Sequence, residues 1–331
     1  MEDTRYGGQA VIEGVMMRGV SHVALSVRAP GGDILSLIKK APGLKDKSWF
    51  VRLPVIRGAF ALWDSLSLGI EMLVKSAEIA SPEEAKPTEG ANFLSVAFAV
   101  VVAVGLFVLL PTFLTPYLLG LVGLGGPVYV SLFETVLRLL ILVLYILAIS
   151  RMKEIQRVLA YHGAEHKVVW AWEKNRAAGQ ALLEDVYQSG THLSLGYSPV
   201  GEGLLETMSP GLSGIKDFLC RKAAGESRLH PRCGTSFLFL AVMCTWVVFL
   251  FVNPEGIVTR AVVRLALLPL VAGLAYEVLR ASAGKEGIFW SAIKAPGMAL
   301  QSLTTREPDS AMLEVAATSL ALLLMKERGE S

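Results

Sequence analysis

Four long apolar stretches dominate the pattern of hydrophobic and polar positions along this chain, at 93–119, 128–149, 235–252 and 261–279. A helix needs roughly 20 apolar residues to cross a hydrocarbon core of about 30 Å, and each stretch approaches or exceeds that length. The pattern therefore predicts an α-helical integral membrane protein with about four transmembrane helices. Prolines near the end of the first stretch and within the fourth predict kinks there, because proline lacks the N–H that a helix uses.

A different pattern occupies residues 53–79, where apolar positions recur at helical spacing but charged residues interrupt them. The interrupting residues are Arg57, Asp64, Glu71 and Lys75. This pattern favours an amphipathic helix over 53–80 that lies in the membrane interface. A fifth membrane span is the alternative.

The two ends of the chain are less apolar. Apolar residues alternate with others over 23–27, the turn residues APGGD follow at 29–33, and 34–38 predicts a returning strand. We therefore expect a small N-terminal β element. Near the other end, 312–325 predicts an amphipathic helix that packs on the cytoplasmic side.

The distribution of basic residues orients the predicted bundle. Basic residues follow the second and fourth stretches, whereas the link at 120–127 carries no charge. Loops rich in Lys and Arg stay in the cytoplasm, so we expect both termini and the segment between the two hairpins to be cytoplasmic. Arg260 and Arg264 argue mildly against this orientation at the second outer turn. The expected regions are the N-terminal β-containing part (1–52), the interfacial helix (53–80) and a transmembrane hairpin (91–149). They continue with a motif-bearing cytoplasmic region (150–233), a second hairpin (234–280) and a cytoplasmic C-terminal region (281–331).

Composition supports a membrane protein and narrows the partners. Hydrophobic residues make up 53% of the chain and charged residues 18%, and the net charge of +2 is too small to indicate a nucleic-acid binder. The lipid bilayer is the expected partner, and a homo-oligomer is compatible with this organisation. Three scattered cysteines without a CxxC pair favour a reducing compartment. The N-terminal sequence does not have the pattern of a cleavable signal peptide.

One candidate chemical motif follows the second apolar stretch. In YHGAEHK (161–167), His162 and His166 are four residues apart, so on a helix both side chains lie on one face. Glu165 borders that face. The pattern HxxEH is that of the inverted zinc proteases, in which the histidines bind metal and the glutamate acts on the bound water. A polar helix face packed against lipid headgroups is the alternative.

A second candidate motif, LHPRCGTSF (229–237), precedes the third apolar stretch. His230 and Cys233 offer an imidazole and a thiolate, and Arg232 could steady a developing negative charge. Four ligands drawn from both motifs would make a closed, structural site, whereas three would leave a position for water. Cys233 could instead be a small buried hydrophobic residue.

Charged residues also occur inside the second apolar stretch. Glu134 and Arg138 are four residues apart, in the order that favours a helical ion pair. We interpret them as a self-neutralising pair that faces the bundle interior. A transport path is the alternative, since charges inside lipid are costly.

Four motifs together resemble the signatures of the YqhQ-like bacterial membrane proteins: GGQAVIEGVMMRG (7–19), YHGAEHK (161–167), LHPRCGTSF (229–237) and LTTREPD (303–309). That family carries a domain of unknown function and is described as predicted metal-dependent enzymes. The resemblance implies one shared site, adds Glu13 and residues 306–309 as its neighbours, and implies a bacterial inner membrane location. The chain departs from the pattern by an insertion at about 189–226.

We therefore expect a membrane-embedded enzyme that depends on a divalent metal, with zinc as the metal, and that acts as a hydrolase at the cytoplasmic face. His162, His166, His230 and Cys233 are the predicted ligands, with Glu165 as general base and Arg232 as a second catalytic residue. The alternative is a non-enzymatic scaffold, transporter or insertion factor, with a structural metal or none.

Overall fold

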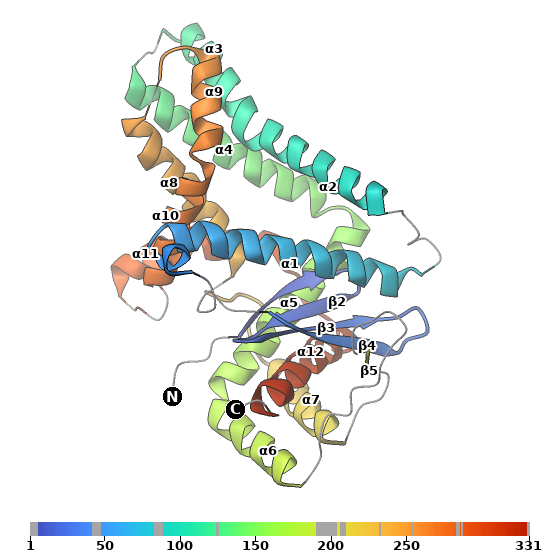
Figure 1. The fold of residues 1–331 in the computed structure, drawn as a ribbon. Helices are drawn as coiled ribbons and strands as arrows, with labels where there is room; N and C mark the ends of the chain where they lie inside the picture. Colours follow the sequence, from blue (N-terminus) through green and yellow to red (C-terminus); the bar gives the residue numbers. More distant parts are fainter. Residues whose placement is uncertain are drawn as a thin grey trace.

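The structure, a computed structural model, describes residues 6–41, 48–82, 89–123, 126–189, 204–205, 210–231, 233–252, 254–282, 285 and 287–329. Its elements form two parts (Figure 1), which we call the helical bundle and the sheet domain. One long helix, α1 (Ile56–Ala80), lies crosswise between them. The predicted fold class is confirmed: the chain is mostly helical, has candidate membrane spans and begins with a small antiparallel sheet.

The helical bundle holds the membrane spans. Three stretches are long and apolar enough to cross a membrane: Leu94–Leu121, Pro127–Ile149 and Gly234–Phe251. They are formed by α2 (Glu89–Val104) with α3 (Leu110–Leu121), by α4 (Pro127–Ile149) and by α8 (Gly234–Phe251). A fourth candidate is bent by 49° between α9 (Ile257–Ala266) and α10 (Leu268–Ser282). The prediction of about four spans agrees with this, and α11 (Ile288–Thr304) follows α10.

Two prolines account for irregularities in these spans. Pro269 lies just after the bend between α9 and α10, where its ring and missing N–H disfavour a straight helix. Pro111 cannot donate to the carbonyl of Phe107, its partner in a regular helix. A π-helical turn, Gly105–Leu109, occupies this position, and Arg138 Nε donates to the Phe107 carbonyl at 3.1 Å. A side chain from α4 thus satisfies a carbonyl that the proline leaves open.

The sheet domain begins with an antiparallel meander of β1 (Gly7–Val11), β2 (Gly14–Arg18), β3 (His22–Arg28), β4 (Ile34–Lys40) and the short β5 (Leu204–Leu205). The predicted pair at 23–27 and 34–38 corresponds to β3 and β4. Successive side chains point to opposite faces. Val15 and Met17 therefore face one apolar cluster, whereas Met16 faces another that includes Met72 of α1. The sheet is packed on both faces.

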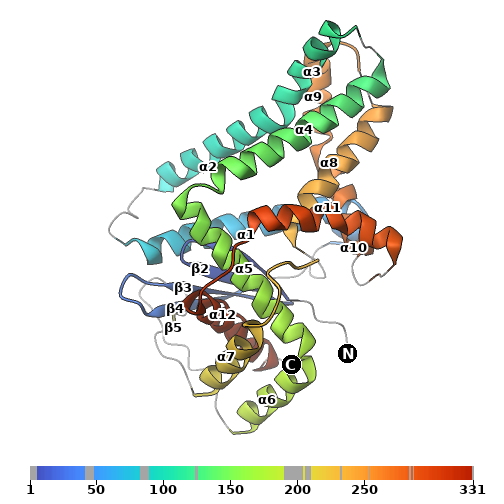
Figure 2. The same ribbon diagram turned by 180° about the vertical axis from the view of Figure 1, so that it is seen from behind.

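Two helices, α5 (Lys153–Lys174) and α12 (Ser310–Gly329), cover the face of the sheet opposite α1 (Figure 2). Helix α7 (Pro210–Ala223) packs on both of them, with α6 (Arg176–Gln188) beside them. The C-terminal helix differs from our expectation for 312–325. We expected an amphipathic helix, but α12 is buried around almost its whole circumference, including Ala316, Leu320 and Leu323. The reason is that β2, β3, α5 and α7 all pack against it. It is the central helix of the domain.

Helix α7 falls inside the predicted insertion at 189–226. Its residues Leu212, Ile215 and Leu219 are buried in the same cluster as α12 and α5. This part of the segment is therefore a core element of the sheet domain. Most of the remainder of the segment lies outside the described residues.

The predicted helix at 53–80 is confirmed as α1, and its charged residues have partners on the sheet domain or on α10. Arg57 donates to Glu277 at 2.7 Å, Asp64 accepts from Arg18 at 2.6 Å, and Glu71 accepts from Lys39 at 2.6 Å. Exposed Phe60, Trp63 and Leu66 lie on the remaining surface of the helix. The polar side of α1 therefore points into the protein, and an apolar side is left outward.

Candidate metal centre

Helix α5 carries the first predicted motif. Three residues separate it from the end of α4, so the helix that carries the motif begins close to the end of a membrane span. His162 and His166 are one helical turn apart, and their ring centroids are 4.5 Å apart. The expectation that both side chains share one face of a helix is confirmed.

Each of these rings is held at Nδ1 by a backbone carbonyl. His162 Nδ1 lies 2.8 Å from the carbonyl oxygen of Thr304, and His166 Nδ1 lies 2.5 Å from that of Arg228. A carbonyl only accepts, so Nδ1 carries the proton in both neutral rings and Nε2 carries the lone pair. Metal-binding histidines in proteins are commonly held in this way. Both Nε2 atoms are thus prepared to bind a cation.

Cys233 brings the third donor atom from a distant part of the chain. It caps the N-terminus of α8, and its Sγ lies 3.2 Å from His162 Nε2. The Thr235 hydroxyl and backbone N–H donate to the same sulfur at 3.3 and 3.5 Å. One donor atom from each of His162, His166 and Cys233 lies within 4.8 Å of the other two.

This donor set fits a zinc ion. Zn–N and Zn–S bonds of about 2.1 and 2.3 Å in a tetrahedral site place ligand atoms about 3.3–3.7 Å apart. The observed donors are close to those separations, since they lie within 4.8 Å of one another and His162 Nε2 is 3.2 Å from Cys233 Sγ. Two imidazoles and a thiolate are also the donor types that zinc prefers over calcium or magnesium. The buried Nε2 of His166 has no hydrogen-bond partner among the described residues. A metal ion bound there would accept its lone pair.

Glu165 lies beside this group. Its Oε2 is 3.5 Å from His166 Nε2, and the residue is only 5% exposed. A glycine makes room for it: a Cβ at Gly8 of β1 would lie 2.8 Å from Glu165 Cγ. The first strand therefore packs closely on the carboxylate, which can either bind a metal directly or accept a proton from water on it.

The fourth predicted ligand, His230, lies next to the group rather than in it. Its Nε2 is 3.4 Å from a carboxylate oxygen of Glu173, and its ring centroid is 5.7 Å from that of His166. The side chain of Gln301 holds its backbone, accepting from the N–H and donating to the carbonyl, both at 2.8 Å. Burial lowers the pKa of His230, against the opposing effect of the Glu165 charge. Arg232 lies outside the described residues.

The neighbours implied by the family resemblance hold α5 in place. Glu13, at φ +51° in the turn between β1 and β2, accepts from the Arg157 guanidinium and from the Tyr161 hydroxyl at 3.4 Å. The backbone of Arg306 crosses α5 so closely that Gly163 has no space for a side chain. Asp309 caps α12 by accepting from the Met312 N–H at 2.8 Å. These contacts fix the helix that carries both histidines.

The charged pair inside the second span is part of a larger cluster. Glu134 accepts a hydrogen bond from Arg138 and forms an ion pair with Arg264, and all three are buried. Arg264 also donates to the Thr112 hydroxyl at 2.8 Å. Both guanidinium groups lie against the ring of Phe249, at 5.6 and 4.9 Å from its centroid. The sequence pattern places Arg264 at an outer turn, where it argues against the expected membrane orientation. In the structure it is an internal residue of the bundle.

Several residues of the site have no signal in the sequence. Thr304 and Arg228 act through backbone carbonyls, which every residue carries. Gln301 acts on the backbone of His230 from 71 residues away. Only the LTTREPD motif, which contains Thr304, pointed to this part of the chain.

Fold and site together define a multi-pass membrane protein with a candidate two-histidine, one-cysteine metal site beside its spans. The chain belongs to the family described as "Protein of unknown function (DUF1385)", whose model matches residues 53–187 and 215–326. It is 29% identical over 338 residues to a protein of Bacillus subtilis (strain 168) described as "Uncharacterized protein YqhQ", and this alignment covers 97% of the chain and 93% of the relative. No solved structure matches the chain.

These matches confirm the resemblance found in the sequence. The candidate residues His162, Glu165, His166, His230 and Cys233 all lie in the matched ranges. The interval between the two matched ranges is 188–214, so the match already resumes within α7. The departure from the family is therefore shorter than the expected insertion at 189–226, which fits the core position of α7.

Proposed function

We propose that this protein is a membrane-embedded, zinc-dependent hydrolase. His162, His166 and Cys233 bind the metal, and Glu165 is the general base. One observation carries the proposal: two carbonyl-held imidazoles direct Nε2 atoms toward a thiol, and a buried carboxylate lies 3.5 Å from one of them. Pre-positioned neutral histidines together with a general base are the requirements of hydrolytic zinc sites.

The roles of the residues follow from this arrangement. A zinc ion with three protein ligands supplies a bound water whose pKa is about 7. Thr304 and Arg228 keep both imidazoles in the tautomer that binds. Glu165 accepts the proton of the attacking water, and the close packing of Gly8 against its side chain limits its movement. His230, held by Gln301, borders the site beside His166.

Metal analysis of the purified protein tests the binding half of the proposal. We expect the wild-type chain to retain one zinc ion per molecule through purification. The variants His162→Ala, His166→Ala and Cys233→Ser lose it. Cys244→Ser is the matched control, because it removes a thiol from the same helix outside the donor group. Wild-type protein that holds no more metal than Cys233→Ser contradicts the proposal.

The variant Glu165→Gln tests the catalytic half. If the carboxylate is the base, Glu165→Gln keeps the metal and loses hydrolysis in a screen of ester, amide and phosphoester substrates. If the carboxylate is the fourth ligand, the same variant loses metal affinity, and the site is closed.

That second outcome favours a structural metal as the second candidate function. Its supporting observation is where the ligands come from: two belong to α5 of the sheet domain, and the third caps α8 of the bundle. A metal there would join the two parts of the molecule. His230→Ala discriminates further, since loss of metal in this variant identifies His230 as a ligand.

We also propose that the site and both termini lie on the cytoplasmic side of a bacterial inner membrane, with α1 in the interface. The sheet domain carries both histidines of the site and the described ends of the chain (Figure 1), and basic Arg151, Lys153 and Arg157 adjoin it. Fusions test this orientation. Green fluorescent protein fused at the C-terminus should fluoresce, and alkaline phosphatase fused after Gly123 should be active. The reverse pattern contradicts the orientation.

A further inference from the structure

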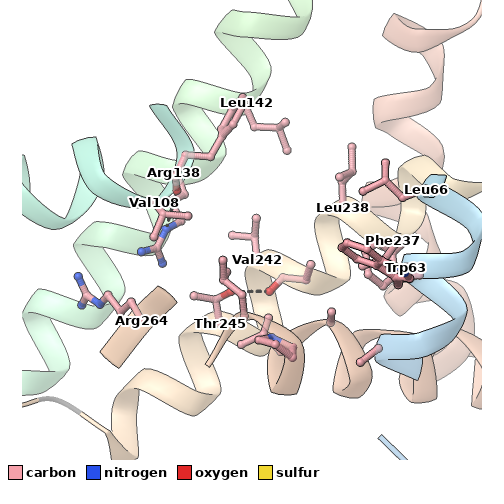
Figure 3. Close-up of a pocket in the computed structure, with 18 of the residues that line it drawn as sticks. Trp63, Leu66, Val108, Arg138, Leu142, Phe237, Leu238, Val242, Thr245 and Arg264 are labelled. Carbon is pink, nitrogen blue, oxygen red and sulfur yellow. Dashed lines mark hydrogen bonds between the residues drawn. The ribbon is translucent and has the colours of Figure 1, made fainter. Parts of the chain in front are cut away.

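A partly open apolar cavity of about 1040 Å³ lies between the bundle and α1 (Figure 3). Its walls come from α1, α4, α8 and α10 and include Trp63, Leu66, Leu142, Phe237 and Val242. Pockets for small molecules commonly measure about 300–1,000 Å³, so this one is large. Because α4 and α8 are membrane spans, the cavity lies at the depth of the hydrocarbon core.

The charged residues at the wall do not make the cavity an ion site. Arg138 and Arg264 lie at the end away from Trp63 and Leu66 in Figure 3. Both form ion pairs with Glu134 and lie against Phe249. Each guanidinium group therefore already interacts with a carboxylate and with an aromatic ring inside the protein. The remaining lining is almost wholly apolar, so its complementary occupant is a hydrocarbon chain.

One wall residue of the cavity also contacts the candidate metal centre. Thr304 belongs to the wall, and the carbonyl of the same residue holds His162 Nδ1 at 2.8 Å. Ile149, the last residue of α4, lies in the wall as well. A molecule in the cavity would therefore have one end at the depth of the spans and the other next to the candidate ligands.

We propose that the cavity holds the hydrocarbon chain of a membrane lipid, whose polar group lies at the metal centre. The inference rests on the proposed function and names its substrate class: an amphiphile that enters from the bilayer. A lipid chain is the occupant that the surroundings provide, since the cavity opens among apolar spans. Trp63 and Leu66 on α1 line the side of the cavity that faces away from the arginines, and both side chains are exposed there.

The test uses full-length protein in lipid nanodiscs that contain a phosphatidylglycerol with a photoactivatable diazirine in its acyl chain. After irradiation, we expect labelled peptides from 59–66 and 237–245. Ala272→Trp fills the cavity from α10 and should reduce this labelling several-fold. Leu270→Trp is the matched control on the same helix, because Leu270 is exposed and lies outside the cavity wall.

Two further variants separate the possible failures. Ala241→Leu fills less space than tryptophan and should still reduce labelling if Ala272→Trp fails to fold. His162→Ala should lose the metal but keep the labelling, because the cavity wall is intact. Absence of metal in the wild-type chain contradicts the proposed function alone. Equal labelling of the wild type, Ala272→Trp and Ala241→Leu contradicts the lipid proposal. Such a result would mean that the cavity does not hold the lipid chain, for example because a helix of a partner protein fills it.

Discussion

The Nε2 atom of His162 lies 3.2 Å from the Sγ atom of Cys233, although 71 residues separate the two in the chain. The intervening chain includes α6 and α7 of the sheet domain. The contact therefore joins α5 of the sheet domain to the beginning of a membrane span, α8. Such a contact between two metal-binding residue types predicts a thiolate–metal bond.

Cobalt substitution tests this bond directly. We expect the cobalt(II)-loaded protein to show a sulfur-to-cobalt charge-transfer band in the near ultraviolet, because a thiolate is among the ligands. Cys233→Ser should abolish the band, and Cys244→Ser should leave it unchanged. A band that persists in Cys233→Ser would show that the thiol does not bind the metal.

The segment after α11 crosses α5 very closely at Gly163. We therefore expect that adding one methyl group at Gly163 lowers the stability of the protein. In Gly163→Ala, the new Cβ overlaps the carbonyl oxygen of Arg306, and backbone cannot move aside as a flexible side chain can. We expect a loss of about 1–3 kcal/mol in the free energy of unfolding, and weaker metal binding because Thr304 is displaced with Arg306. Thermal unfolding in detergent measures the first effect.

Gly214→Ala is the control for this change. Gly214 lies within α7, and a Cβ there meets nothing within 4 Å. Alanine lowers the conformational entropy of the unfolded chain, so this variant should gain about 0.5–1 kcal/mol. Equal behaviour of the two variants would contradict the close packing at Gly163.

The buried cluster of the bundle predicts an asymmetry between its partners. Glu134→Gln leaves two buried guanidinium groups without their carboxylate, and we expect a loss of about 3–5 kcal/mol. Arg264→Met leaves the one-to-one pair of Glu134 and Arg138 and should cost less. Unfolding by titration with a denaturing detergent gives the comparison. A larger loss in Arg264→Met would argue against Glu134 as the common counterion.

Acid stability should depend on Glu314 of α12. Burial raises its pKa, but hydrogen bonds from Lys216 and Arg28 outweigh that effect and hold the pKa below its usual range. A lowered pKa in the folded state adds stability above the ordinary value of about 4.3, which is lost as the pH falls through the folded value. Glu314→Gln should therefore destabilise at neutral pH and flatten the acid limb of the stability curve.

The magnitude of this effect is modest, because the Glu314 side chain is 37% exposed. Solvent screens such pairs, so we expect roughly 0.2–1 kcal/mol for each ion pair. Unfolding measured between pH 7 and pH 3 checks it, with the exposed carboxylate of Glu78 as control in Glu78→Gln. Parallel pH curves for Glu314→Gln and the wild type would contradict the assignment.

Much of the fold could be predicted because the lipid bilayer imposes simple rules. Span length and apolar continuity identify α4 and α8 without knowledge of tertiary contacts. The alternation at 23–27 identifies β3 for a similar reason. The charges of α1 were harder to interpret, because a sequence shows their spacing but not the sheet residues with which they pair.

The predictions became less complete where long-range packing decides. The sequence could not show that α12 is surrounded, because its many alanines and leucines fit a one-sided stripe as well as a buried core. The sequence predicted that His162, His166 and Cys233 converge, but it also placed His230 among the ligands. In the structure, Gln301 of α11 holds the backbone of His230, whose ring lies against Glu173. Supporting carbonyls such as that of Thr304 depend on backbone position alone.

The central place of α12 has a consequence for biosynthesis. Among the described helices it is the last to leave the ribosome, yet β2, β3, α5 and α7 all pack on it. The membrane spans and the sheet are synthesised before α12. The apolar face of the sheet that α12 covers therefore stays exposed until α12 has been made. Transiently exposed apolar surface and strand edges are prone to aggregation. A nascent chain that stalls or is truncated before residue 310 should therefore be a substrate for chaperones and membrane proteases.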